Sequence, residues 1–287
     1  MPWQPPTYLL VGPDELGRDT PVRVRVVGDQ ADVAQTMAAS MRDEILAARD
    51  AGRGATLIVP VGPVDQFPVL ARMINDQRID CRDVLLINMD EYLTDQDRWV
   101  PPDHPLSFRG FMNRKFYDLV EPALAPRPEN RLFPDPEQPE AILQRIEERG
   151  GVDCCYGGVG INGHIAFNEP PEPMPDSPAD PMSLETFRAL PTRTLTLARE
   201  TRTINSVTVG GDIGVIPARA VTVGMREILA AQRLRFYCNR PWQRGIVRRL
   251  LHGPITAACP ASLLRLHPDA ELTVASYVAE RPDIQLR

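Results

Sequence analysis

The sequence predicts an α/β fold with a mostly parallel sheet, formed by one domain that spans residues 1–287. Two observations lead to this prediction. Short apolar runs rich in β-branched residues alternate with longer segments of helical periodicity, which is typical of βαβ units. In addition, no linker or internal repeat divides the chain, and hydrophobic residues make up 43% of it, enough for a large core.

Seven apolar runs are predicted to form the strands. Each is short, and longer segments separate most of them, as expected when helices connect parallel strands. The runs cover residues 22–27, 56–62, 83–89, 153–160, 220–225, 234–238 and 271–276.

Three segments are predicted to be helices. Between residues 30 and 51 an apolar residue recurs every four positions, and Gly52 follows as a stop signal. Segments 104–120 and 139–151 are also predicted to be helical, and the second ends in glycines. The recurring apolar residues of the first segment are Val33, Met37, Met41 and Ile45.

Residues 170–192 are rich in proline and are expected to lack regular structure over much of their length. Long loops of this kind in a compact domain are usually functional or mobile, so this loop is a candidate lid. The alternative is a solvated excursion with no part in function.

Charge and hydropathy limit the partners of the protein. The formal net charge is −6 and no segment is dense in lysine or arginine, so nucleic acid is not expected as a partner. No apolar run approaches the roughly 20 residues that span a bilayer. The first residues also lack a signal-peptide pattern. We therefore expect a cytoplasmic protein that binds a small molecule.

Cysteine and histidine spacing argues against disulfides and metals. The five cysteines include no C-x-x-C pair, and two are adjacent within an apolar run, which is typical of buried free thiols. The four histidines show no metal-ligand spacing, so no metal is expected.

Residues able to do chemistry follow four of the predicted strands. In open α/β sheets ligands bind outside the carboxyl ends of the strands, so a site is expected there. The segments that carry these residues are 60–65, 88–92, 157–170 and 223–227.

Asp90 and Glu91 directly follow an apolar strand. Two carboxylates in such a place are costly unless they are solvated, hydrogen-bonded or used in function. The alternative is an aspartate that caps the next segment, which requires only one of the pair.

His164 lies in the segment "GGVGINGHIAFNEP", between Asn162 and Glu169. Either neighbour could bond one ring nitrogen and fix the tautomer, which makes His164 a candidate general acid or base. A lone histidine is more often structural, but the glycines around this one allow close approach to a ligand.

Four segments together resemble, in order and spacing, the glucosamine-6-phosphate deaminase/isomerase family. The likeness covers roughly residues 30 to 275, and the related 6-phosphogluconolactonases share the fold. The resemblance implies a Rossmann-like three-layer α/β sandwich, no cofactor, and conversion of a 2-amino aldose phosphate to a ketose phosphate with loss of ammonia. The segments are "INMDEYL" (87–93), "HPLSFRGFM" (104–112), "GGVGINGHIAFNEP" (157–170) and "AVTVGMREILAA" (220–231).

The resemblance also implies roles for individual residues. Asp90 would move a proton between C2 and C1 of the sugar, and His164 would exchange a proton with the ring oxygen. Glu169 would orient His164, as in a dyad. Gly158, at a strand end, would offer backbone groups to sugar hydroxyls.

Asn162 departs from the family pattern, which has aspartate two residues before the histidine. An aspartate would favour the imidazolium by its charge, whereas an amide orients the ring without that field. We therefore expect a different pH dependence of ring opening.

The expected phosphate site departs further. The family has a small-residue loop where this chain has Gly62, a proline and Asp65, and a proline has no N–H to donate. The family's phosphate-binding arginine falls at Val207 and its lysine at Gln243, although Arg240 and Arg244 are close by. Because charge-assisted bonds supply much of the affinity for phosphate, this site is predicted to be altered or absent.

We therefore expect a glucosamine-6-phosphate deaminase/isomerase-like enzyme that isomerises and deaminates an amino sugar or related sugar. The alternatives are a true glucosamine-6-phosphate deaminase with a rebuilt phosphate site, a sugar lactonase, and a non-catalytic sugar sensor. Family members occur as monomers and as hexamers, so a homo-oligomer is also open. The candidate catalytic residues are Asp90, Asn162, His164 and Glu169, and the candidate substrate-binding residues are Gly62, Asp65, Glu91, Gly158 and Arg244.

Overall fold

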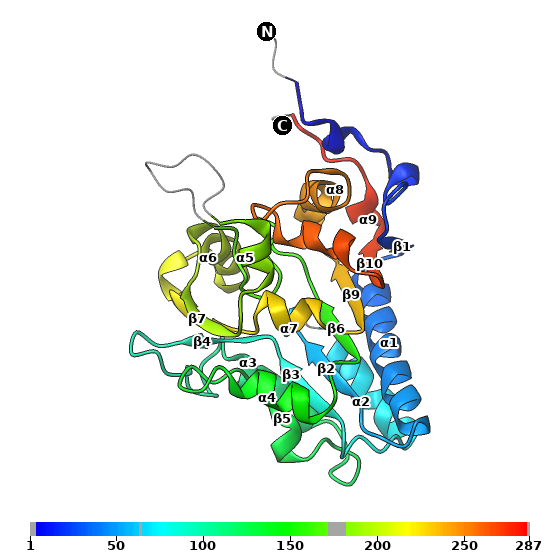
Figure 1. Cartoon of the computed structure of the whole chain (residues 1–287), viewed down its shortest axis with the longest axis vertical. Helices are drawn as coiled ribbons and strands as arrows, with labels where there is room; N and C mark the ends of the chain where they lie inside the picture. The colour runs from blue at the N-terminus through cyan, green and yellow to red at the C-terminus, as the bar shows by residue number, and fades with distance from the viewer. Residues whose placement is uncertain (1–3, 63–64, 172–181, 286–287) are drawn as a thin grey trace.

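A parallel seven-stranded sheet forms the centre of the molecule (Figure 1). The computed structural model describes residues 4–62, 65–171 and 182–285. All neighbouring strands of this sheet run parallel, which confirms the predicted α/β class. In spatial order the strands are β1 (Arg23–Val27), β10 (Ala270–Ala275), β9 (Arg233–Cys238), β6 (Cys154–Gly157), β2 (Thr56–Val59), β3 (Leu85–Asn88) and β5 (Arg131–Leu132).

Helices cover both faces of the sheet. The chain crosses the sheet in one direction from β1 to β5 and returns from β5 to β10. Because βαβ crossovers are right-handed, the helices of the outward and return halves lie on opposite faces. Figure 1 shows α1 (Gln30–Asp50) and α2 (Gln66–Asp76) side by side on one of them. The return half carries α4 (Ala141–Glu148) and α8 (Arg244–His252).

The remaining elements are short. A π-helical turn, Asn113–Tyr117, extends α3. Among the 3₁₀ turns, Thr7–Leu10 contacts α8, and Pro241–Gln243 directly precedes α8. The short helices are α3 (Phe108–Met112), α5 (Leu184–Arg188), α6 (Arg199–Ser206), α7 (Met225–Leu229) and α9 (Ser276–Ala279).

A second, antiparallel sheet corrects one strand prediction. The run 220–225 was expected among the strands of a mostly parallel sheet, but it forms β8 (Arg219–Thr222) outside that sheet. There β8 pairs with β4 (Asp90–Leu93) on one side and β7 (Arg193–Thr196) on the other. The chain reaches β4 one residue after β3, so Asp90 begins a new strand instead of a loop.

The helix predictions are confirmed in two of three places. α1 covers 30–50, and the side chain of Asp29 caps it by accepting hydrogen bonds from the N–H groups of Ala31 and Asp32. α4 lies within 139–151. The segment 104–120 is helical only from Phe108, because the Ser107 side chain caps the N–H of Gly110 and so begins α3 there.

Part of the loop predicted as a lid, residues 172–181, lies outside the described residues. Within its described part, α5 forms and buries Phe187. Its role as a lid stays a prediction.

All five cysteines are buried and free, as predicted. Among the described residues, none of the helices combines the length and apolar character needed to cross a membrane.

Candidate active site

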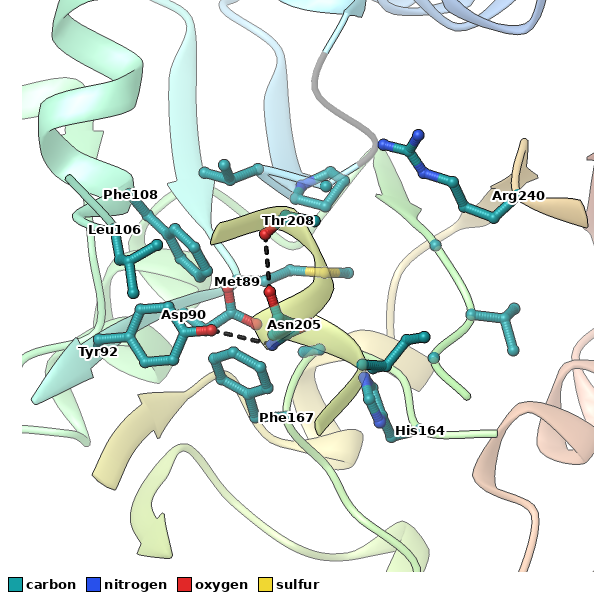
Figure 2. A pocket seen from close by; sticks show the side chains of 18 of the residues that line it. Met89, Asp90, Tyr92, Leu106, Phe108, His164, Phe167, Asn205, Thr208 and Arg240 are labelled. Carbon is teal, nitrogen blue, oxygen red and sulfur yellow. Dashed lines mark hydrogen bonds between the residues drawn. The ribbon is translucent and has the colours of Figure 1, made fainter. Parts of the chain in front are cut away.

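A cavity of about 490 Å³ lies at the carboxyl ends of the central strands (Figure 2). Four of the segments that line it follow parallel strands, and three of them are segments that the strand-end argument predicted. The fourth follows β9, and the predicted segment 223–227 is wrong, because its strand lies outside the main sheet and none of its residues lines the cavity. The four lining segments contribute Pro60 to Gly62 after β2, Met89 and Asp90 after β3, Gly158 to Gly160 after β6, and Asn239 and Arg240 after β9. Residues of α6 and of the segment 105–111 close the other side.

Asp90 lines this cavity with only 7% of its surface exposed. Its backbone is fixed by pairing with Thr222 of β8, and Tyr92, two residues on, packs its ring against Phe108 and Phe167. Burial, and then the negative charge of Glu91, raise the pKa of Asp90 well above its ordinary value. No described residue donates a hydrogen bond to its carboxylate, which leaves a strong base facing the cavity.

Glu91 points away from the cavity and holds the start of α3. Its carboxylate accepts hydrogen bonds from the Ser107 hydroxyl at 2.9 Å, the Phe108 N–H at 3.0 Å and the Arg109 N–H at 2.8 Å. Burial raises the pKa of Glu91, and these hydrogen bonds oppose that rise. Its predicted contact with substrate has no counterpart in this geometry, because the side chain does not line the cavity.

His164 also lines the cavity, and its Nδ1 atom lies in a polar cluster of residues that do not line it. Nδ1 lies 2.8 Å from Asn162 Oδ1, 3.3 Å from Glu169 Oε2 and 3.2 Å from Thr201 Oγ1. The amide oxygen and the carboxylate only accept hydrogen bonds, so this network assigns the proton of the neutral ring to Nδ1. The lone pair of Nε2 is then the reactive group.

Asn162 joins the two partners of His164. Its amide donates to Glu169 Oε2 at 2.7 Å, and its oxygen also accepts from the His164 N–H at 3.2 Å. Burial alone would raise the pKa of Glu169. Hydrogen bonds from His164, Asn162 and Thr201, and the positive charge of the ring when it is protonated, hold that pKa below its ordinary value. Asn162 and Glu169 therefore contact the ring of His164 but do not line the cavity themselves.

Gly160 explains one glycine of the motif. Its N–H donates to the His164 carbonyl at 3.0 Å, which closes the loop tightly. A Cβ atom added here would lie 2.1 Å from the imidazole, far inside contact distance. A glycine is therefore needed for the ring to occupy this place, a requirement that the sequence indicated only in general terms.

The structure divides the predicted substrate-binding residues. Gly62 and Gly158 line the cavity. Asp65 does not, and its carboxylate accepts a hydrogen bond from the Gln30 amide. Arg244 is also outside, because its Nε donates to the Tyr277 carbonyl at 2.7 Å and its Nη2 pairs with Glu280.

The two positions where the family's cationic side chains were expected provide no positive charge. Val207 lines the cavity with 68% of its surface exposed. The amide of Gln243 is used within the protein, donating to the Val159 carbonyl at 2.7 Å and accepting from the Arg240 N–H at 2.8 Å.

Several cavity residues were not predicted from the sequence. The amide of Asn205 donates to the Tyr92 hydroxyl at 2.9 Å, and the Thr208 hydroxyl donates to the Asn205 carbonyl at 2.7 Å. Asn239 was also missed, although a polar residue directly after the strand 234–238 follows the same strand-end pattern that indicated Asp90.

Comparisons with known proteins agree with this geometry. No family model matches the chain. Glucosamine-6-phosphate deaminases are similar to it: that of Cronobacter sakazakii is 31% identical over 226 residues, 77% of each chain, and that of Bifidobacterium longum is 28% identical over 266 residues, 89% of this chain and 91% of the relative.

Solved structures show the same likeness. A monomeric glucosamine-6-phosphate deaminase matches with a TM-score of 0.73 and 25% identity over 90% of this chain and 99% of its own. The 6-phosphogluconolactonase of Thermotoga maritima, at 14% identity, shares the fold with a TM-score of 0.63 over 89% of this chain and 100% of its own.

The fold and the site define an α/β enzyme of the isomerase/hydrolase type, with a buried carboxylate and a supported histidine at the strand ends. Given 31% identity over 77% of both chains, the chain belongs to the glucosamine-6-phosphate deaminase family.

Proposed function

We propose that the protein converts a 2-amino aldose to a ketose with release of ammonia, and that its 6-phosphate site is altered. The observation that carries this proposal is that Asp90 and His164 face one cavity, with the ring of His164 held by Asn162 and Glu169. The similar proteins named as deaminases support the reaction class and do not favour a lactonase or a silent sensor.

His164 would open the sugar ring. The Nε2 lone pair takes the proton of the anomeric hydroxyl and returns it to the ring oxygen, so that the ring C–O bond breaks and an aldehyde forms at C1. Glu169 stabilises the imidazolium that exists between the two transfers, since its carboxylate lies 3.3 Å from Nδ1.

Asp90 would carry out the isomerisation. Its carboxylate removes the proton on C2 of the open chain while the ammonium group on C2 gives a proton to the aldehyde oxygen, so that an enol forms. The protonated Asp90 then gives its proton to C1. The C2 centre is then an iminium, which adds one water and loses ammonia, so that amino sugar and water yield ketose and ammonia.

Replacing Asp90 with asparagine tests the proposal. We expect release of ammonia from amino sugars to fall by about 10² to 10⁴-fold, because the general base is lost. Binding, followed by thermal shift, should persist. A variant that releases ammonia like the parent would contradict the role of Asp90, and release of an acid from a sugar lactone instead would indicate hydrolysis.

The altered phosphate site has a separate test. Neither Val207 nor Gln243 supplies positive charge to the cavity, so glucosamine 6-phosphate is expected to be a poor substrate. Efficient turnover of this compound at micromolar concentration would contradict the prediction.

The cellular setting follows from other features. Five buried free thiols suit a reducing compartment, so we place the enzyme in the cytoplasm. We also propose residues 170–192 as the lid of the cavity. The oligomeric state is a separate matter, and size-exclusion chromatography would distinguish a monomer from a homo-oligomer.

A further inference from the structure

We propose that Asn239 and Arg240 form a distal subsite that binds a carboxylate, so that the substrate is an amino-sugar acid of the 2-amino-2-deoxyhexuronate class. This inference rests on the proposed function and specifies its substrate. Both residues follow β9 and line the same cavity as Asp90 and His164.

Arg240 is the cation of this subsite. Among the described residues its guanidinium has no ion pair and no hydrogen-bond partner, whereas Arg53 and Arg219, for example, are paired with carboxylates. Figure 2 shows the guanidinium well away from the Asp90 carboxylate and the His164 ring, at the other end of the group of side chains. Of the described residues that line the cavity, only Asp90 carries a carboxylate, so no described acid neutralises Arg240 there.

Asn239 supplies a second donor. Its side chain is 4% exposed, and among the described residues its amide nitrogen has no hydrogen-bond partner. A hydrogen bond of 2.7 Å from the Tyr277 hydroxyl to its carbonyl fixes the backbone of the turn. Buried donors without a partner are rare in proteins because each has lost its hydrogen bonds to water without replacing them. Asn239 also lines the cavity, so we infer that a ligand with an acceptor group bonds this donor.

The charge and shape of the subsite favour a carboxylate over a phosphate. A guanidinium matches the two oxygens of a carboxylate with parallel hydrogen bonds, and each oxygen can accept another bond, here from Asn239. One cation balances one negative charge. A phosphate dianion would keep a second charge beside Val207 and Gln243, which offer none to balance it.

Neighbouring side chains add no further positive charge to the subsite. Arg244, four residues further on, is turned to Tyr277 and Glu280 and lies outside the cavity. The amide of Gln243 is likewise occupied by backbone groups. The ligand must therefore find its compensating charge in Arg240 alone.

Calorimetric binding tests the subsite without requiring turnover. The probes are 2-amino-2-deoxyglucuronic acid, glucosamine and glucosamine 6-phosphate, measured on the Asp90→Asn background. We expect the uronic acid to bind about 10- to 100-fold more tightly than glucosamine, since hydrogen bonds to a charged group are the strong ones. Arg240→Gln should remove that advantage and leave the affinity for glucosamine unchanged.

A matched control is Arg49→Gln, which removes an exposed arginine paired with Asp50 at the end of α1. It should leave all three affinities unchanged. Tighter binding of the 6-phosphate than of the uronic acid, or uronic acid binding that is indifferent to Arg240→Gln, would overturn the inference.

Turnover of the protein with Asp90 intact separates the inference from the proposed function. With the uronic acid, Arg240→Gln should raise KM at least tenfold and change kcat little, because the distal contact is the same in ground and transition states. Binding that depends on Arg240 without any release of ammonia would reject the proposed function and keep the subsite. Release of ammonia from the uronic acid that does not depend on Arg240 would keep the proposed function and reject the subsite.

Discussion

Asn162 stands between a histidine and a carboxylate, where its amide can bond both. The Asn162→Asp variant would place a second carboxylate at the 2.7 Å contact with Glu169. Like charges at this distance cannot both ionise readily, so one carboxyl should retain a proton, and the added charge should favour the imidazolium.

We expect the acid limb of the pH–rate profile of Asn162→Asp to move to higher pH. The free energy of unfolding should fall as pH rises, because a carboxyl whose pKa is raised by folding gives stability that is lost above that pKa. Rates and urea unfolding between pH 5 and 8 measure both effects. Profiles that superimpose on those of the parent would show that the amide has no electrostatic role.

The ionisation of Asp90 should make both kcat/KM and stability depend on pH. Burial and the charge of Glu91 raise its pKa, so the carboxylate that we propose as the base forms only above an unusually high pH. kcat/KM should therefore rise with pH through this raised value. Stability should be highest below it and decline above, since folding favours the protonated form. Asp90→Asn should abolish that decline, and melting curves across pH would show whether it does.

Gly160 offers a test of how closely the histidine is positioned. Gly160→Ala places a methyl group 2.1 Å from the ring, so His164 must turn away. We expect kcat/KM to fall about 10²-fold, as for other small misplacements of a catalytic group. Gly245→Ala is the control: its Cβ would meet only Leu9, at an ordinary 3.7 Å, and should leave activity intact. Equal activity of the two variants would contradict the role given to Gly160.

At the level of elements, Glu91 joins β4 to α3. Its two oxygens accept hydrogen bonds from Ser107, Phe108 and Arg109, and all of these donors belong to the start of one helix. Glu91→Gln would turn an amide group toward these donors and leave at least one of them unpaired. We expect the free energy of unfolding, measured by urea denaturation, to fall by about 1–3 kcal/mol.

Glu148→Gln is the comparison for this variant, because Glu148 forms an exposed ion pair with Arg145 on α4. Removing an exposed pair should change stability by less than about 1 kcal/mol. Similar losses in both variants would mean that Glu91 does not hold α3.

Local patterns account for what the sequence predicted about the elements. The four-residue spacing in 30–51 gave α1, because a helix buries one stripe whatever its neighbours are. The run 220–225 is equally apolar, yet it pairs antiparallel with β4 and β7 outside the main sheet. The apolar pattern of a strand indicates that it is buried but not which strands it pairs with. The position of β8 outside the main sheet could therefore not be predicted.

The same limit applies to the site. Asp90 and His164 were found because a carboxylate after a buried strand and a histidine among glycines are local features. Asp65 and Arg244 were expected at the substrate, but long-range partners, Gln30 and Glu280, hold them elsewhere. The role proposed for Arg240 depends on the lack of such a partner among the described residues, which only the fold reveals.

At the scale of the whole molecule, the two ends of the chain are joined by one buried arginine. The Arg248 side chain of α8 is fully buried and donates to the carbonyls of Val11 at 2.9 Å, Arg244 at 3.1 Å and Ala279 at 2.6 Å. Burial, and then the nearby Arg281 and Arg244, lower its pKa to about 10. Figure 1 shows the N-terminal segment running beside α8 and α9, where these bonds lie.

Arg248→Met should therefore destabilise the entire domain. Three carbonyls lose their donor, and we expect the free energy of unfolding to fall by about 3 kcal/mol. Because one sheet and one core connect the termini to the cavity, far-UV circular dichroism and tryptophan fluorescence should still report a single coincident urea transition. Arg49→Met should cost less than about 1 kcal/mol, since its ion pair is exposed. A first, separate transition in Arg248→Met would instead mean that the terminal segments unfold on their own, and that the domain is less unified than its continuous sheet implies.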